Sequence, residues 1–494
     1  MSEAALLAID QGTSSSRAMA FSDSGELLGI EQQSFESLYP APGWVEHDPE
    51  VLWATVLSTS RTLLRRVRAA GYEVVALGLT NQRETSIVWN RRTGAPIHNA
   101  IVWQDRRTAQ RCRELVRAGH ESLVIDRTGL RLDPYFSATK LAWILDAVAG
   151  ARSAAQAGEL AFGTVDSFLL WRLTGGKSHL TDASNASRTA LYDIRRGCWD
   201  TALCELFGVP PRGLPEVRDS AGDFGTTDPE LYGEALPIRG VAGDQQAALL
   251  GQGCVQAGDA KCTYGTGAFL VANTGERLIS SSRKLISTIA WRIGGRVTFA
   301  IEGSILSAGS IVQWLRDALG LFTRSEQIEA LAGSAAGSGG VHLIPAFTGL
   351  GAPYWDPDAR AAILGLTPQS GRAEIARAAL ESVVYQTCDL IEALAHDGVA
   401  PALLKVDGGM TRNALFCQLL TDMLEVPVLC PRMQEATAFG AACLAGLGQG
   451  LYGSLEQVAN LWQPSRRYVP AMDASRRATA LAAWRDALQR VRTT

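Results

Sequence analysis

The opening of the chain is repeated in its second half, and this repeat limits the folds that the sequence can adopt. Two apolar runs flank a turn of small polar residues, and a tight turn leads to a third run, at Leu6–Ile9, Ala18–Phe21 and Leu27–Ile30. The same order of runs and turns returns at Ala260–Tyr264, Gly265–Gly267, Ala268–Ala272 and Asn273–Gly275. Short apolar runs separated by such turns are typical of strands. We therefore expect a duplicated unit, divided into residues 1–250 and 251–494.

Helices alternate with these strands. Asp48 is suited to cap a helix that has Pro49 at its first position, and that helix is expected to end near Gly71. Further elements are expected at Val74–Leu79, Val341–Ile344, Glu374–Ala395, Leu403–Val406, Ala414–Leu424 and Ala436–Leu447. Strands alternating with helices indicate an α/β layer structure.

The first turn of each half is a candidate phosphate cradle. Asp10-Gln11-Gly12-Thr13-Ser14-Ser15-Ser16-Arg17 combines a glycine, several hydroxyl groups and an arginine. Consecutive backbone N–H groups in such turns form a concave site for anions. Taken alone, the segment reads more readily as an ordinary hairpin turn. Gly265-Thr266-Gly267, at the matching place in the second half, favours a polyphosphate held from both sides.

Two other nucleotide motifs are excluded. Gly176-Lys177-Ser178 resembles the end of a P-loop, but Trp171 stands where that motif needs glycine. Gly265-x-Gly267 has Leu270 in place of the third glycine of a dinucleotide fingerprint. The sequence therefore predicts neither a Walker ATPase nor a dinucleotide-binding enzyme.

Composition narrows the possible partners. Lys plus Arg number 46 and Asp plus Glu number 50, a net charge of −4, which gives no basic surface for nucleic acid.

Neither a metal site nor a targeting segment is indicated. The nine cysteines contain no C-x-x-C pair, and the histidines lack metal-binding spacing. The N-terminal apolar run ends at Asp10 with no basic residue before it, which argues against a signal peptide. We expect a cytoplasmic protein without membrane insertion.

Three polar segments follow predicted strands, where α/β sheets bind ligands. Arg83 and Glu84 offer donors and an acceptor for vicinal hydroxyls, although adjacent charges are as readily a surface ion pair. Asp244 could accept a hydroxyl proton or hold Mg²⁺, but an aspartate here is also a common helix cap. Asp407-Gly408-Gly409 and Asn413 could approach a base or ribose, or could simply connect a strand to a helix.

Together these segments resemble the glycerol kinase branch of the FGGY carbohydrate kinase family. Matching stretches occur over nearly the whole chain, from Asp10–Arg17 through Pro42–Pro49, Thr80–Glu84, Ala100–Gln104, Asp133–Ser137, Gly243–Ala248, Tyr264–Phe269 and Pro345–Asp356 to Asp407–Gly409. Only the region after about Pro464 matches loosely. The resemblance implies two actin-like (ribonuclease-H-like) lobes around a nucleotide cleft. It also implies transfer of the γ-phosphoryl group of ATP, with Mg²⁺, to glycerol.

The resemblance assigns roles residue by residue. It implies that the glycerol site comprises Arg83, Glu84, Trp103, Tyr135, Asp244, Gln245 and Phe269, with Asp244 as the general base. The nucleotide contacts would be Thr13, Ser14, Ser15, Arg17, Thr266, Gly309, Gln313, Gly409 and Asn413. Asp10 and Asp244 would lie near the metal. Judged by spacing alone, Trp103, Tyr135 and Phe269 are more often core residues than residues that line a ligand site.

Two alternatives remain at this point: a kinase of another polyol or a ketose, and a non-catalytic actin-like nucleotide switch. Some relatives bind fructose 1,6-bisphosphate through an arginine where this chain has Ala235, and others are phosphorylated on a histidine where it has Glu230. Neither form of regulation is expected here. We expect a homodimer or homotetramer.

Overall fold

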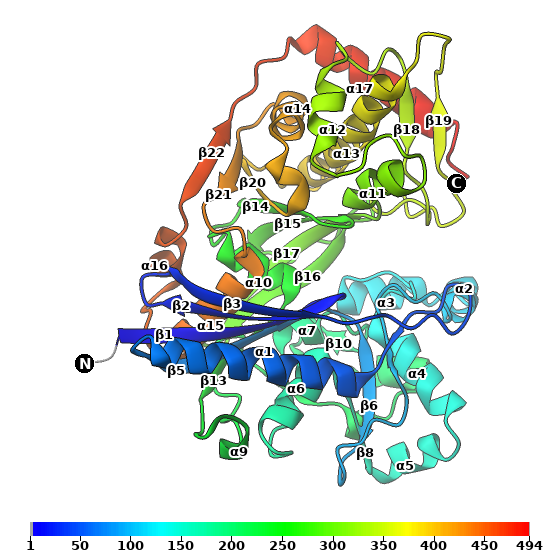
Figure 1. Cartoon of the computed structure of the whole chain (residues 1–494). Coiled ribbons are helices and arrows are strands. Elements are labelled where there is room, and N and C mark those ends of the chain that lie inside the picture. The colour runs from blue at the N-terminus through cyan, green and yellow to red at the C-terminus, as the bar shows by residue number, and fades with distance from the viewer. Residues whose placement is uncertain (1–2, 494) are drawn as a thin grey trace.

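Two twisted sheets organise the chain in a computed structural model that describes residues 3–493 (Figure 1). The first sheet has the order β13-β5-β1-β2-β3 and the second the order β16-β17-β15-β14-β20-β21-β22. The first comprises β1 (Glu3–Gln11), β2 (Ser15–Ser22), β3 (Leu27–Ser34), β5 (Tyr72–Asn81) and β13 (Ile238–Gly243). The second comprises β14 (Ala260–Tyr264), β15 (Ala268–Gly275), β16 (Ile286–Ile293), β17 (Arg296–Ile305), β20 (Leu404–Asp407), β21 (Val428–Pro431) and β22 (Pro464–Tyr468).

Both sheets are built in the same way, which confirms the duplicated α/β unit. In each, two antiparallel strands open the unit, and two later strands extend the sheet in parallel from the first of them. In the first sheet β5 pairs with β1 and β13 with β5; in the second β20 pairs with β14 and β21 with β20. The second half differs in its third strand. The tight turn predicted at Asn273–Gly275 is wrong, because these residues are the end of β15. A longer connection follows to Ile286, β16 lies at the sheet edge, and β17 pairs with β15.

Smaller sheets and helices complete the first half. A four-stranded sheet contains β4 (Glu46–His47), β7 (Ala100–Ile101), β6 (Ser86–Asn90) and β8 (Leu160–Thr164). Short pairs are formed by β9 (Leu180–Asp182) with β12 (Glu216–Arg218) and by β10 (Tyr192–Asp193) with β11 (Cys198–Trp199). The helices are α1 (Pro49–Ala69), α2 (Ala109–Arg117), α3 (Glu121–Thr128), α4 (Ser137–Ala147), α5 (Ala151–Ala157), α6 (Val165–Leu173), α7 (Ala183–Ala186), α8 (Thr201–Phe207), η1 (Pro211–Gly213), α9 (Pro229–Tyr232) and α10 (Asp244–Gly251).

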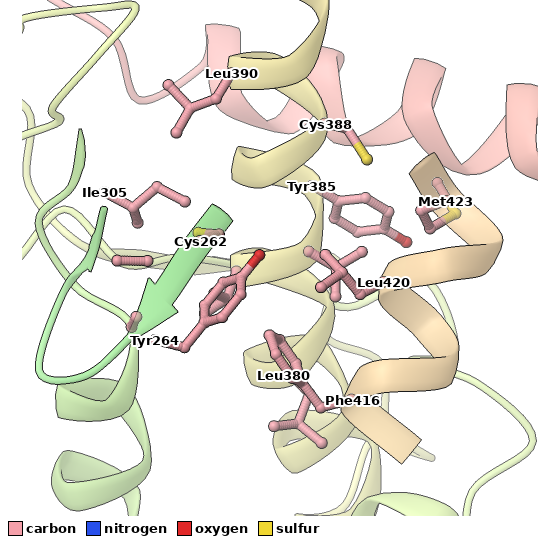
Figure 2. Packing of buried hydrophobic residues seen from close by; sticks show 14 of the residues in the cluster. Cys262, Tyr264, Ile305, Leu380, Tyr385, Cys388, Leu390, Phe416, Leu420 and Met423 are labelled. Carbon is pink, nitrogen blue, oxygen red and sulfur yellow. The ribbon is translucent and has the colours of Figure 1, made fainter. Parts of the chain in front are cut away.

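The remaining elements belong to the second half. They are α11 (Gly309–Asp317), α12 (Gln327–Gly333), β18 (His342–Ile344), β19 (Ala362–Leu364), α13 (Arg372–His396), η2 (Gly409–Arg412), α14 (Ala414–Leu424), α15 (Ala436–Gln449), α16 (Leu455–Asn460) and α17 (Ala474–Gln489). The core of this half lies between the sheet and α13 and α14 (Figure 2). Tyr264 of β14 is fully buried there: its ring centroid lies 5.0 Å from that of Phe416, and its hydroxyl is 3.0 Å from that of Thr387.

Helix α1 forms for the local reasons that the sequence indicated. The Asp48 carboxylate accepts a hydrogen bond of 2.8 Å from the Glu50 N–H, and Pro49 follows it at the first helical position. Leu52, Val56, Leu63 and Val67 are buried against the first sheet. The expected helices at 374–395, 414–424 and 436–447 are also present, with small shifts at their ends.

Helices α10 and α15 lie between the two sheets (Figure 1). Their buried side chains join a core that includes Leu6 and Phe21 of the first sheet and Val271 and Trp291 of the second. Although α15 comes late in the chain, it packs on β1, β5 and β13. The division of the chain after residue 250 therefore stays a prediction. Within residues 3–493, every helix is too short or too polar to traverse a lipid bilayer.

Glycines allow α10 and α15 to approach closely. A Cβ atom on Gly251 would lie 1.9 Å from the Ala436 carbonyl oxygen, and one on Gly440 would lie 1.8 Å from the Ala247 carbonyl oxygen. Both carbonyls belong to backbone, which cannot move aside as a side-chain tip can. A larger residue at either position would push the two helices apart and so disturb the packing between the two sheets.

Replacement of Gly440 by alanine tests this packing. Gly440→Ala should lower the free energy of unfolding by about 1–3 kcal/mol, because overpacking of a filled core has that cost. Gly333→Ala in α12 is the matched control, because the nearest atom to its added Cβ lies 3.9 Å away. Urea unfolding followed by circular dichroism measures both variants. A Gly440→Ala protein as stable as Gly333→Ala would contradict the packing argument.

Candidate active site

Two charged side chains are buried directly after strand β5. Arg83 and Glu84 are 3% and 1% exposed, so the alternative of a surface ion pair is wrong. Glu84 has a left-handed backbone, with φ of 60°, and its carbonyl accepts hydrogen bonds from Ser137 at 3.0 Å and Lys140 at 3.2 Å. A non-glycine residue in this conformation stores strain that the surroundings must hold. The turn thus directs both charges inward.

Arg83 connects residues from distant parts of the chain. Its Nε lies 3.1 Å from Asp244 Oδ1, and its Nη2 donates to the Tyr135 hydroxyl at 3.3 Å. Its Nη1 and Nη2 donate to the two carboxylate oxygens of Glu302 at 2.5 and 3.1 Å. The site therefore combines residues that follow β5, precede α4, begin α10 and lie within β17.

Glu84 is held by a second arginine. Arg188 Nε donates to Glu84 Oε1 at 2.6 Å, and its Nη2 donates to Glu302 Oε1 at 3.1 Å. Burial alone would raise the pKa of Glu302, but Arg188 and Arg83 outweigh it and lower the pKa to about 2. Glu302 is therefore a carboxylate at every pH at which the protein would be studied.

Asp244 is the first residue of α10, and Gly243 rather than Asp244 occupies the cap position. Its side chain is 29% exposed, unlike those of Arg83 and Glu84. The Gln245 N–H donates to Oδ1 at 2.7 Å, and Gln245 Oε1 in turn accepts a hydrogen bond from Lys261. Burial raises the pKa of Asp244, while Arg83 and Lys261 oppose that rise. A carboxylate so placed can take up a proton nearer neutral pH than usual.

Three aromatic rings adjoin these charges. The Trp103 ring lies 5.7 Å from that of Tyr135 and 6.1 Å from that of Phe269, both close to perpendicular. The guanidinium of Arg83 lies 5.9 Å from the Phe269 ring centroid. Trp103, Tyr135 and Phe269 together form an aromatic wall. Because Phe269 comes from β15, the second half of the chain supplies part of it. Trp103 Nε1 also donates to Thr13 Oγ1 at 2.9 Å. This hydrogen bond joins the aromatic wall to the candidate phosphate cradle at Asp10–Arg17, called here the first phosphate turn.

The first phosphate turn is the loop of the β1–β2 hairpin, in which Asp10 pairs with Arg17. Burial raises the pKa of Asp10 to about 7; Arg17 opposes this shift, and the carboxylates of Asp244 and Glu435 add to it. Arg17 Nη1 donates to Glu435 Oε2 at 2.9 Å. Ser14 is exposed, whereas Ser15 is buried and its hydroxyl accepts a hydrogen bond from Gln32 at 3.0 Å.

The second phosphate turn, Gly265–Gly267, packs against two other loops. The Gly309 N–H donates to the Gly265 carbonyl at 2.9 Å, and the Ser310 N–H donates to that of Thr266 at 3.1 Å. Gly408 has φ of 92°, and a Cβ there would lie 2.3 Å from the Tyr264 carbonyl oxygen, so the loop before Gly409 lies against the end of β14. The predicted nucleotide residues Thr266, Gly309 and Gly409 are thus neighbours through their backbones.

Asn413 and Gln313 complete the predicted nucleotide set. Asn413 Oδ1 caps α14 by accepting from the Phe416 N–H at 2.9 Å, while its buried Nδ2 has no hydrogen-bond partner among residues 3–493. Gln313 is exposed on α11, one turn beyond Gly309. Both stay predictions as nucleotide contacts.

The buried charges of the site that were not selected from the sequence include Arg188, Glu302 and Lys261. Each is 0% exposed. A signal existed for Glu302, since it is the single charged residue in the run Phe299–Ile305 of an apolar strand. Lys261 is likewise the single charged residue of β14. Buried charges are almost always paired, so a lone charge in such a strand predicts a partner without identifying it.

Comparisons with known proteins agree with this architecture. Family models of the FGGY carbohydrate kinases match residues 5–251, as the N-terminal domain, and 260–448, as the C-terminal domain. Glycerol kinase of Rhodospirillum centenum is 56% identical over 487 residues, which are 99% of this chain and 98% of the relative. Glycerol kinase 1 of Pseudomonas aeruginosa is 54% identical over 487 residues, 99% of each chain.

A solved structure gives the same result. The crystal structure of Plasmodium falciparum glycerol kinase with ADP has a TM-score of 0.93 and 34% identity, and the match covers 99% of this chain and 98% of that one. The chain belongs to the FGGY family of carbohydrate kinases. Its two sheets form the centres of two actin-like lobes.

The raised pKa of Asp10 predicts a pH-dependent cost to folding. Between the pKa of an unfolded aspartate, near 4, and about 7, the folded protein holds this proton more tightly, so stability falls as pH rises through that window. Asparagine cannot ionise. Asp10→Asn should therefore raise the Tm of the ligand-free protein at pH 8, and raise it less at pH 5, in thermal unfolding scans.

Asp223→Asn provides a control of opposite sign. The Gly225 N–H and Arg239 lower the pKa of Asp223, so loss of its charge should lower the Tm at pH 8. An Asp10→Asn protein whose gain in Tm does not grow between pH 5 and pH 8 would contradict the assignment.

Proposed function

We propose that this protein is a kinase that transfers the γ-phosphoryl group of ATP to glycerol, giving sn-glycerol 3-phosphate and ADP. The observation that carries the proposal is the convergence of Arg83, Tyr135 and Asp244 beside the aromatic wall. Relatives named glycerol kinase, at more than half identity over almost the whole chain, support it. The Plasmodium falciparum glycerol kinase was crystallised with ADP, the product of ATP, which supports the use of ATP.

The site is suited to a small triol. Arg83 supplies donors, Glu84 and Asp244 supply acceptors, and the Tyr135 hydroxyl can do either. A triol has little apolar surface, so its selection depends on hydrogen bonds; a buried partner left unpaired costs about 1–3 kcal/mol. Trp103 and Phe269 would cover the carbon skeleton and exclude water, and Gln245 would assist from the start of α10.

Asp244 is the proposed general base. Its two fixed contacts, with Arg83 and with the Gln245 N–H, both fall on Oδ1. Oδ2 has no hydrogen-bond partner among residues 3–493, so it can accept the hydroxyl proton as the oxygen attacks the phosphoryl group. Because burial raises the pKa of Asp244, proton transfer to it is easier than to an ordinary aspartate.

The nucleotide would be held by the turns of both lobes. Thr13, Ser14, Ser15 and Arg17 would contact it from the first, and Thr266, Gly309, Gln313, Gly409 and Asn413 from the second. The unpartnered Nδ2 of Asn413 is a donor that a bound nucleotide could satisfy. Phosphoryl transfer depends mainly on positioning and charge stabilisation, which such turns provide.

Asp10 and Asp244 are the residues that would hold Mg²⁺. The carboxylates of Asp244 and Glu435 lie near enough to Asp10 to add to the rise of its pKa, so this part of the site holds negative charge that a cation could offset. Among residues 3–493, no group of three or more His, Cys, Asp or Glu could hold a metal. Mg²⁺ commonly uses only one or two carboxylates together with substrate phosphates, so the two residues fit. The ion would neutralise phosphate charge during transfer.

We also propose a cytoplasmic location. All nine cysteines are free thiols and eight of them are buried, as is usual in a reducing compartment. The expected homodimer or homotetramer stays a prediction.

Substitution of Asp244 tests the proposed base. Asp244→Asn should reduce kcat with glycerol by about 10²–10⁴-fold, the usual contribution of a general base, while ATP binding changes little. Coupled detection of ADP measures turnover, and calorimetry measures nucleotide affinity. Near-normal turnover would remove Asp244 from the mechanism.

A substrate panel distinguishes the remaining alternatives. With saturating Mg-ATP, the rate of ADP formation should rise with glycerol and rise far less with erythritol or xylulose. A higher rate with a longer polyol or a ketose would indicate another substrate class. ATP binding that is unaffected by every polyol, without turnover, would indicate a nucleotide switch.

A further inference from the structure

Glu302 is a fully buried carboxylate within β17, beside the apolar residues Ile301 and Ile305. Removal of such a charge from water is costly unless the charge is paired and hydrogen-bonded. Glu302 has two partners of opposite charge, Arg83 and Arg188, and both come from the first half of the chain. It is therefore a direct electrostatic connection between the two lobes, next to the glycerol site.

The geometry shows what Glu302 does to Arg83. Two carboxylate oxygens accept from Nη1 and Nη2, an arrangement that fixes the plane of a guanidinium as well as its position. With that plane fixed, Nε faces Asp244 and Nη2 reaches the Tyr135 hydroxyl. Without Glu302, Asp244 and Glu84 would be the remaining carboxylates near Arg83, and the plane of its guanidinium would no longer be fixed.

Arg188 extends this control to Glu84. It donates from Nη2 to Glu302 and from Nε to Glu84 Oε1, so one guanidinium aligns both carboxylates. Arg188 is itself 0% exposed and lies over the ring of Phe136, 5.3 Å from its centroid. Arg83, the proposed donor to the glycerol hydroxyls, is thus oriented by Glu302, and Glu84, the proposed acceptor, is oriented by Arg188.

We propose that Glu302 and Arg188 are positioning residues of the glycerol site, and that the site is complete only while Glu302 of one lobe holds Arg83 of the other. This inference rests on the proposed function. Neither residue is required to touch glycerol: Glu302 acts through Arg83, and Arg188 acts through Glu84.

Glu302→Gln is the central test, measured against the unaltered protein in the same ADP-coupled assay. KM for glycerol should rise on the order of 10-fold to 10²-fold, because buried hydrogen-bond partners of glycerol lose their alignment. KM for ATP should change little. Glu302→Asp keeps the charge but shortens the side chain, so KM for glycerol should stay high.

Glu381→Gln is the matched control. Glu381 is a buried carboxylate, 2.7 Å from Arg377 on α13 and outside the site. Glu381→Gln should leave KM for glycerol unchanged even if the protein is less stable. Should Glu302→Gln fail to fold, Arg188→Lys tests the same inference. Lysine keeps the positive charge but lacks the planar guanidinium that can donate to Glu302 and Glu84 together, so KM for glycerol should rise.

The outcomes separate the two proposals. An unaltered protein that does not phosphorylate glycerol refutes the proposed function and this inference with it. If the unaltered protein phosphorylates glycerol and Glu302→Gln or Arg188→Lys matches it in KM for glycerol, the inference alone is refuted. Equal rises in KM for glycerol and for ATP would also refute it, because they indicate general structural damage.

Discussion

The interaction on which the site depends is the pairing of Glu302 with Arg83 and Arg188. Two guanidinium groups cannot be buried together unless carboxylates neutralise them, and Glu84 alone would leave an excess of positive charge. Glu302 supplies the missing charge from the other lobe. With these four groups fixed, Arg83 faces Asp244 and Tyr135, and its guanidinium lies beside the ring of Phe269 in the aromatic wall.

The site is arranged at a cost to folding. Asp10 and Asp244 are acidic groups whose burial raises their pKa values, and the charge of Asp244 adds to the rise at Asp10. Glu84 adopts a left-handed backbone that no glycine relieves. Features of this kind persist where binding or catalysis needs them, because the surrounding structure compensates for the strain.

Local elements were predictable from the sequence, and long-range ones were not. Asp48 and Pro49 define the start of α1 within a few residues, and the repeated strand order was visible in both halves. The contact between Arg83 and Glu302 joins residues 219 positions apart, and neither neighbourhood identifies the other. Arg188, in a short segment after α7, gives no local signal. The predicted glycerol residues Arg83, Tyr135 and Asp244 are brought together, whereas the roles of all site residues stay predictions.

The position of α15 has a consequence for synthesis on the ribosome. This helix packs on β1, β5 and β13, yet its last residue is Gln449, near the end of the chain. As translation proceeds, the amino-terminal sheet therefore emerges with one apolar face uncovered, and stays so until most of the polypeptide has been made. Exposed faces of this kind promote aggregation and recruit chaperones, so the nascent chain is most vulnerable during that interval.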